Sequence, residues 1–160
     1  MASTEKNLSD VRLSQDFEIS KFKFGIVVSE WNEQVTEALY SGAYQTLINA
    51  GADRDKIERM NVPGTFELSL GGQWIAERKD VDAVICLGCV IQGETRHFDF
   101  ICDAVANGIT NVSLKYNKPV IFGVLTPDTM KQALDRAGGK HGNKGDEAAA
   151  TAIKMLQVRS

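Results

Sequence analysis

The chain has 160 residues, of which 43% are hydrophobic, and a formal net charge of −3 at neutral pH. This length is enough for one domain that buries about two-thirds of the surface of its unfolded chain. The slightly negative charge without a basic block argues against nucleic-acid binding. The longest apolar run, residues 81–91, is too short to span a membrane, and the N-terminus has no signal-peptide core. We therefore expect a cytoplasmic protein with no membrane partner.

Residues 1–20 are polar and lack a clear period, so we expect a flexible tail or an extended segment that adds to the sheet of a neighbouring subunit. Residues 21–160 should form a single domain. Its first strand is the apolar run 24–29, and apolar positions three or four residues apart then predict a helix that ends near Gly51. A shorter strand over residues 56–62 stops at the turn signal Pro63-Gly64.

The second half of the chain continues the alternation of strands and helices. A helix that begins near Phe66 and ends around Asp80 precedes the buried strand 81–91, and the next apolar period predicts a helix beginning near residues 96–98. Residues 120–125 form a fourth strand, after which Thr126 is a candidate N-cap with Pro127 at the first helical position. A short helix to residue 137, a glycine-rich C-cap and turn over 138–145 and a helix over 146–156 complete the chain.

This order predicts an α/β three-layer sandwich, in which a four-stranded parallel sheet of the flavodoxin-like kind is flanked by helices. Ligands bind such sheets at the carboxyl ends of the strands. The loops expected at that edge carry Trp31 and Asn32, Phe66 and Glu67, the segment 94–97, and Thr126.

The segment 92–97 has the most informative chemistry. Gly93 allows a ligand to approach the backbone, and Thr95 as an N-cap would present free N–H groups and a positive dipole end to a phosphate. The same dipole disfavours an imidazolium, so a neutral His97 could exchange protons near pH 7. A solvated first-turn histidine without a role is an equally weighted alternative.

Other candidate residues also have structural interpretations. Trp31 could cap the core instead of stacking on a heterocycle, Glu67 could complement a helix dipole, and Arg136 suits the end of a helix. Cys86 and Cys89 have CxxC spacing, but three residues apart on a strand they point to opposite faces, so we expect neither a metal site nor a disulfide.

The string Gly-Cys-Val-Ile-Gln-Gly-Glu-Thr-Arg-His-Phe-Asp-Phe over residues 88–100 resembles the signature of the lumazine synthase family. Further motifs agree in order and spacing: Trp31-Asn32, residues 62–67, residues 122–126, residues 132–139 and residues 142–145. The resemblance covers residues 24–156. A flavodoxin-like electron carrier or a response regulator would have the same layout, but the acidic Ser29–Glu33 loop and Val90-Ile91-Gln92 lack their signatures.

The resemblance implies condensation of 5-amino-6-(D-ribitylamino)uracil with 3,4-dihydroxy-2-butanone 4-phosphate to 6,7-dimethyl-8-ribityllumazine, phosphate and water, without cofactor or metal. It implies that His97 is the proton donor. For the ribitylaminouracil it implies binding by Trp31, Asn32, Thr65, Phe66, Glu67, Cys89, Val90, Ile91 and Phe122. For the butanone phosphate it implies binding by Glu94, Thr95 and Arg136, of which Arg136, like Phe122, would belong to the adjacent subunit.

A site shared between subunits implies a homo-oligomer. The family forms pentamers, and a compact turn around residues 138–145 favours a shell of sixty subunits over a free pentamer or a decamer. Riboflavin synthase is a candidate partner. The alternative to an enzyme is a flavin- or lumazine-binding or shell-forming protein of the same fold that lacks the chemistry.

Overall fold

A computed structural model describes residues 17–159 of the chain. The strands are β1 (Phe24–Ser29), β2 (Ile57–Val62), β3 (Ala83–Cys89), β4 (Val120–Leu125), β5 (Ala137–Gly139) and β6 (Gly142–Asn143). The helices are α1 (Glu33–Asn49), α2 (Leu68–Ala76), α3 (His97–Tyr116), α4 (Met130–Asp135) and α5 (Lys144–Arg159), with short 3-10 turns at Ile19–Lys21 and Arg54–Lys56.

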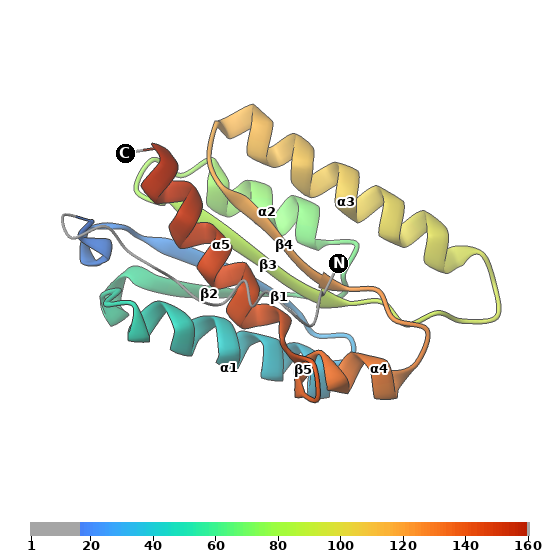
Figure 1. The fold of residues 1–160 in the computed structure, drawn as a ribbon. Coiled ribbons are helices and arrows are strands. Elements are labelled where there is room, and N and C mark those ends of the chain that lie inside the picture. Colours follow the sequence, from blue (N-terminus) through green and yellow to red (C-terminus); the bar gives the residue numbers. More distant parts are fainter. Residues whose placement is uncertain (1–16, 160) are drawn as a thin grey trace.

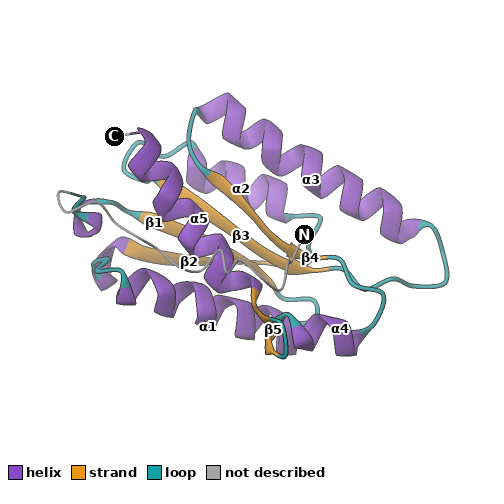
Figure 2. Cartoon of the chain, in the orientation of Figure 1, coloured by secondary structure: helices purple, strands orange, loops and turns teal. Residues whose placement is uncertain are grey.

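The first four strands form one parallel sheet in the order β2-β1-β3-β4 (Figure 2), as the sequence predicts. Every residue of the two central strands is buried, whereas the edge strands β2 and β4 also contain partly buried and exposed positions. This difference explains why β1 and β3 are continuous apolar runs, since a strand covered on both faces buries every side chain.

Helices cover both faces of the sheet and make the predicted three layers (Figure 1). On one face, Leu39 and Leu47 of α1 and Ile153 of α5 pack with Ile26 of β1 in the larger core. On the other face, α2 and α3 enclose a second core, to which Val105 contributes. The strand side chains divide between the two cores because neighbouring positions point to opposite faces.

The start of helix α4 differs from the sequence prediction, and helix α2 is shorter at both ends than the predicted helix from Phe66 to Asp80. Helix α4 begins after Thr129, whose side chain accepts from the Gln132 amide in a capping box, so Thr126 is not the N-cap. Instead the Pro127 carbonyl accepts a hydrogen bond from Gln92 N–H at 2.9 Å, which keeps this segment extended beside the loop that follows β3.

The glycine-rich stretch 138–145 is more ordered than the predicted turn. Strands β5 and β6 pair antiparallel within it, with Gly138 and Gly142 at positive φ. Helix α5 then begins at Lys144, two residues before the predicted start. Glycine is favoured at both turn positions because a Cβ disfavours this backbone region.

Most of the predicted tail lies outside the described residues. Phe17 and Ile19 nevertheless contact the domain: Ile19 is 4% exposed within the larger core, and the Phe17 ring stacks on Phe22 at 5.2 Å between centroids. The part of the predicted tail nearest the domain is therefore packed against it.

Candidate active site

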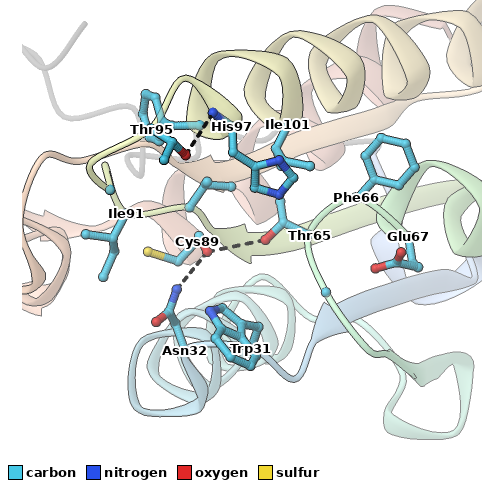
Figure 3. Close-up of a pocket in the computed structure, with 14 residues that line it drawn as sticks. Trp31, Asn32, Thr65, Phe66, Glu67, Cys89, Ile91, Thr95, His97 and Ile101 are labelled. Carbon is cyan, nitrogen blue, oxygen red and sulfur yellow. Dashed lines mark hydrogen bonds between the residues drawn. The ribbon is translucent and has the colours of Figure 1, made fainter.

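A cavity of about 420 Å³ opens at the carboxyl edge of the parallel sheet (Figure 3). Four chain segments contribute to it: the loops after β1, β2 and β3 and the first turns of α3. The residues that line it are Trp31, Asn32, Gly64, Thr65, Phe66, Glu67, Cys89, Val90, Ile91, Gly93, Thr95, His97, Phe98 and Ile101. The loops meet here because parallel strands end at the same edge.

Hydrogen bonds to one backbone carbonyl hold three of these strand ends together. The Cys89 carbonyl accepts from Asn32 Nδ2 at 3.0 Å and from Thr65 Oγ1 at 3.3 Å, both drawn in Figure 3. The buried Ser29 hydroxyl lies 3.5 Å from Thr65 Oγ1. Asn32 adopts φ +63°, a left-handed conformation that asparagine tolerates better than most residues. These contacts give the cavity a fixed floor.

His97 is the first residue of α3, and its side chain projects into the cavity on the side opposite Trp31 in Figure 3. The N-cap of this helix is Arg96, which makes no side-chain capping bond, and not Thr95 as predicted. The Thr95 hydroxyl still accepts from the His97 N–H at 3.4 Å. Since the loop turns one residue later than expected, Thr95 lines the cavity beside the helix terminus.

Two aromatic side chains lie at the open side of the cavity. Trp31 is 73% exposed and Phe66 is 53% exposed, so neither caps the core. The core-capping alternative for Trp31 is therefore excluded within the isolated chain. A large exposed aromatic face beside a cavity suits stacking on a planar ring.

Two of the cysteines, Cys86 and Cys89, are buried. Cys86 and Cys89 belong to cores on opposite faces of the sheet, as their spacing predicts. Burial raises the pKa of the Cys86 thiol to about 12, and burial together with the nearby Cys102 raises the pKa of Cys89 to about 11. Cys89 therefore lines the cavity as a neutral thiol near pH 7.

Within residues 17–159 the structure has no cluster of three or more His, Cys, Asp or Glu side chains that could hold a metal ion. In the same part of the chain no helix is long and apolar enough to cross a membrane.

Comparison with known proteins shows which family the chain resembles over its described length. A sequence model of 6,7-dimethyl-8-ribityllumazine synthase matches residues 21–160. A 6,7-dimethyl-8-ribityllumazine synthase of Cytophaga hutchinsonii is 67% identical over 98% of both chains, and one of Parabacteroides distasonis is 51% identical over 98% of both. A third, from Flavobacterium johnsoniae, is 51% identical over 99% of this chain and 84% of its own length.

The chain belongs to the 6,7-dimethyl-8-ribityllumazine synthase family. The resemblance inferred from the motifs and the three-layer fold are thereby confirmed, and with them the assignment to a family of enzymes.

The cavity contains most of the side chains that the sequence selected, but three predicted residues lie outside it. Glu94 is exposed in the loop before α3, and Phe122 is 36% exposed on the edge strand β4. Arg136 follows α4, where its Nη2 is 2.7 Å from Glu147 Oε1 and its Nη1 donates to the His141 carbonyl.

The sequence prediction did not assign four of the cavity residues to the site. Gly64 belongs to the turn signal after β2, Gly93 contributes through its backbone, and Phe98 and Ile101 belong to the apolar period that predicts the helix. The Phe98 and Ile101 side chains are only partly buried, because the first turns of α3 extend beyond the sheet. Glu147 was also missed, although it lies three residues after Lys144 and pairs with it at 3.1 Å.

Proposed function

We propose that the protein catalyses the condensation of 5-amino-6-(D-ribitylamino)uracil with 3,4-dihydroxy-2-butanone 4-phosphate, giving 6,7-dimethyl-8-ribityllumazine, phosphate and water. The observation that carries this proposal is the cavity itself. It gathers Trp31, Glu67 and His97 from three separate segments of the chain into one site, in a chain of this family. The predicted aromatic, acidic and proton-transferring groups therefore act on one ligand-sized volume.

The pyrimidine ring would stack on Trp31, with the backbone of Cys89, Val90 and Ile91 beside it. The exposed aromatic at the cavity mouth supports this role. Since the Cys89 carbonyl already accepts from Asn32 and Thr65, these two residues shape the pocket through the backbone as well as by contact. The Asn32 Oδ1 remains as an acceptor for a ring N–H.

The ribityl chain would extend toward Thr65, Phe66 and Glu67, which precede α2 and line the same cavity. The Glu67 carboxylate is an acceptor for polyol hydroxyl groups, and Phe66 offers an apolar surface for the carbon chain. The butanone phosphate would lie at the start of α3, near Glu94 and Thr95, where N–H groups at the helix end favour an anion.

His97 would transfer protons as the reaction proceeds. The 5-amino group attacks the ketone and forms an imine with loss of water, and phosphate is then eliminated. The ribitylamino nitrogen next attacks the remaining carbonyl and closes the second ring with loss of a second water. Each step moves a proton between substrate atoms, and a histidine beside them can accept and return it. Holding the two substrates together supplies much of the remaining acceleration, since effective molarities in oriented pairs are high.

Phe122 and Arg136 would complete the cavity of an adjacent subunit. Both lie outside the pocket of their own chain, which supports a site between subunits. Exposed apolar side chains on α2 and α3, namely Leu70, Trp74 and Phe100, supply a surface that an assembly would bury. We propose a homo-oligomer of pentamers arranged as a sixty-subunit shell. A cytoplasmic location and riboflavin synthase as a partner remain predictions.

The decisive experiment mixes the purified protein with both substrates and records the lumazine absorbance together with released phosphate. A rate far above that of the protein-free mixture supports the proposal. A protein that binds the diaminouracil in calorimetry but forms no product above the protein-free rate would instead be the non-catalytic binding or shell protein.

A further inference from the structure

The turn between α4 and α5 is fastened to α1 through the side chain of Asn143. Its Nδ2 donates to the Ala38 carbonyl at 2.9 Å, and its Oδ1 accepts from the Gly145 N–H at 2.8 Å. Ala38 is more than a hundred residues away in the chain. One amide side chain therefore joins the middle of α1 to the start of α5.

Helix α1 is shaped to receive this contact. A Cβ on Gly42 would lie 2.5 Å from Asn143 Nδ2 and 2.3 Å from Asp146 Oδ1. A Cβ on Gly145 would lie 1.9 Å from the Leu39 carbonyl oxygen. Larger residues at either glycine would push the two elements apart, because backbone and polar atoms occupy the space.

The α4–α5 turn and the start of α5 contact both the backbone and the side chain of Arg136. The Arg136 carbonyl accepts from Lys144 N–H at 2.8 Å, directly after Asn143. The guanidinium donates to the His141 carbonyl within the turn and pairs with Glu147 of α5 at 2.7 Å. A shift of the turn away from α1 would therefore displace the guanidinium.

We propose that Asn143 is a positioning residue, which with Gly42 locks the α4–α5 turn on α1 and so fixes the Arg136 guanidinium for phosphate binding. This inference rests on the proposed function, in which Arg136 binds the phosphate of the butanone substrate in an adjacent subunit. Asn143 acts through Arg136 and touches no substrate. Its contribution is orientation, because an arginine fork binds an anion well only in a narrow range of geometries.

The test compares Asn143→Ala and Gly42→Ala with the wild type in the full assembly. The first variant removes both hydrogen bonds, and the second displaces the turn while keeping Asn143. We expect each to weaken competitive inhibition by inorganic phosphate, and to raise KM for the butanone phosphate, by about tenfold. KM for the diaminouracil should change less than twofold.

Asn49→Ala is the matched control. Asn49 is a hydrogen-bonded asparagine on α1, the helix that carries Gly42, and it is exposed and remote from the turn. This variant should leave both KM values unchanged. Because Asn143 acts through Arg136, adding Asn143→Ala to Arg136→Ala should cause no further loss of phosphate affinity.

Two results would overturn the inference and leave the proposed function standing. One is that Asn143→Ala and Gly42→Ala both keep the wild-type inhibition constant for phosphate, while Arg136→Ala raises that constant. The other is an equal rise of KM for both substrates, which would indicate general destabilisation. If Arg136→Ala itself leaves phosphate inhibition unchanged, the proposed role of Arg136 fails and the positioning role fails with it.

Discussion

The two edges of the parallel sheet use polar side chains in opposite ways. At the amino edge, charged residues that precede or begin the strands pair with one another: Lys23 Nζ lies 2.7 Å from Asp80 Oδ2, and Arg78 contacts Glu58 at 2.7 Å and Asp80 at 3.0 Å. The Lys23 N–H also donates to Asp82 Oδ2 at 2.8 Å, which links the starts of β1 and β3.

At the carboxyl edge, the hydrogen bonds hold the backbone while the larger side chains face the cavity. Asn32 and Thr65 donate to the Cys89 carbonyl, whereas Trp31, Glu67 and His97 line the open volume. The comparison shows how one sheet separates two tasks. Polar groups that satisfy each other stabilise the fold, and polar groups directed at a cavity are available to a ligand.

Among substitutions at the two edges of the sheet, His97→Ala should have the largest effect on activity. We expect kcat to fall about 100-fold, because proton transfer by a positioned side chain contributes on that order. The residual rate should exceed the uncatalysed rate, since the cavity still holds both substrates. Steady-state kinetics measure the loss, and an unchanged melting temperature shows that the fold is intact.

A fall of His97→Ala to the rate of the protein-free mixture would contradict this prediction. It would mean that His97 does more than transfer protons.

Trp31→Ala should have a smaller effect, confined to the pyrimidine substrate. Loss of the stacking surface should raise KM for the diaminouracil about tenfold, while Trp31→Phe should stay within threefold of the wild type. Stability should not change, because the Trp31 side chain is largely exposed. An equal rise of KM for the butanone phosphate would argue against stacking on the pyrimidine.

Asp80→Asn tests the amino edge. Hydrogen bonds from Arg78 and Lys23 hold the pKa of Asp80 well below its usual value. Because the native pKa is depressed, the Asp80 carboxylate stabilises the fold above the unfolded-state pKa of about 3.9, and this stabilisation is lost as pH falls toward the native pKa. Asp80→Asn should therefore lower the melting temperature slightly at pH 7 and leave activity unchanged.

The difference between Asp80→Asn and the wild type should shrink in melting curves recorded from pH 5 downward. A difference that stays constant down to pH 2 would show that the carboxylate charge is not responsible.

The smallest effect is expected from Cys89→Ser. The raised pKa of the Cys89 thiol keeps it neutral near pH 7, so it supplies no nucleophile, and activity should stay within threefold of the wild type. Mass spectrometry after iodoacetamide treatment at pH 8 should find Cys86 and Cys89 unmodified in the folded protein. Rapid alkylation of Cys89 with loss of activity would contradict this account.

Much of the fold could be predicted because local patterns and tertiary requirements agree. The runs of β1 and β3 are apolar without interruption because both faces of these strands are covered, and Gly51, which follows α1, has the positive φ expected of a helix-ending glycine. The prediction failed where two local signals competed. Two sequence signals for the start of a helix lie close together here, Thr126-Pro127 and Thr129 with Gln132. The hydrogen bond from Gln92 to Pro127 keeps the first segment extended, so the helix begins at the second.

The residue types of the candidate site and their places after the strands could be read from the chain, because parallel strands bring their carboxyl ends to one edge whatever the details of packing. The tertiary structure alone showed that Trp31 is exposed, that Phe98 and Ile101 line the cavity, and that Glu94 lies outside it. It also joined Asn143 to Ala38 and Arg136 to Glu147. Periodicity reports which face of an element is apolar, whereas exposure and long-range hydrogen bonds depend on how far each element extends past its neighbours.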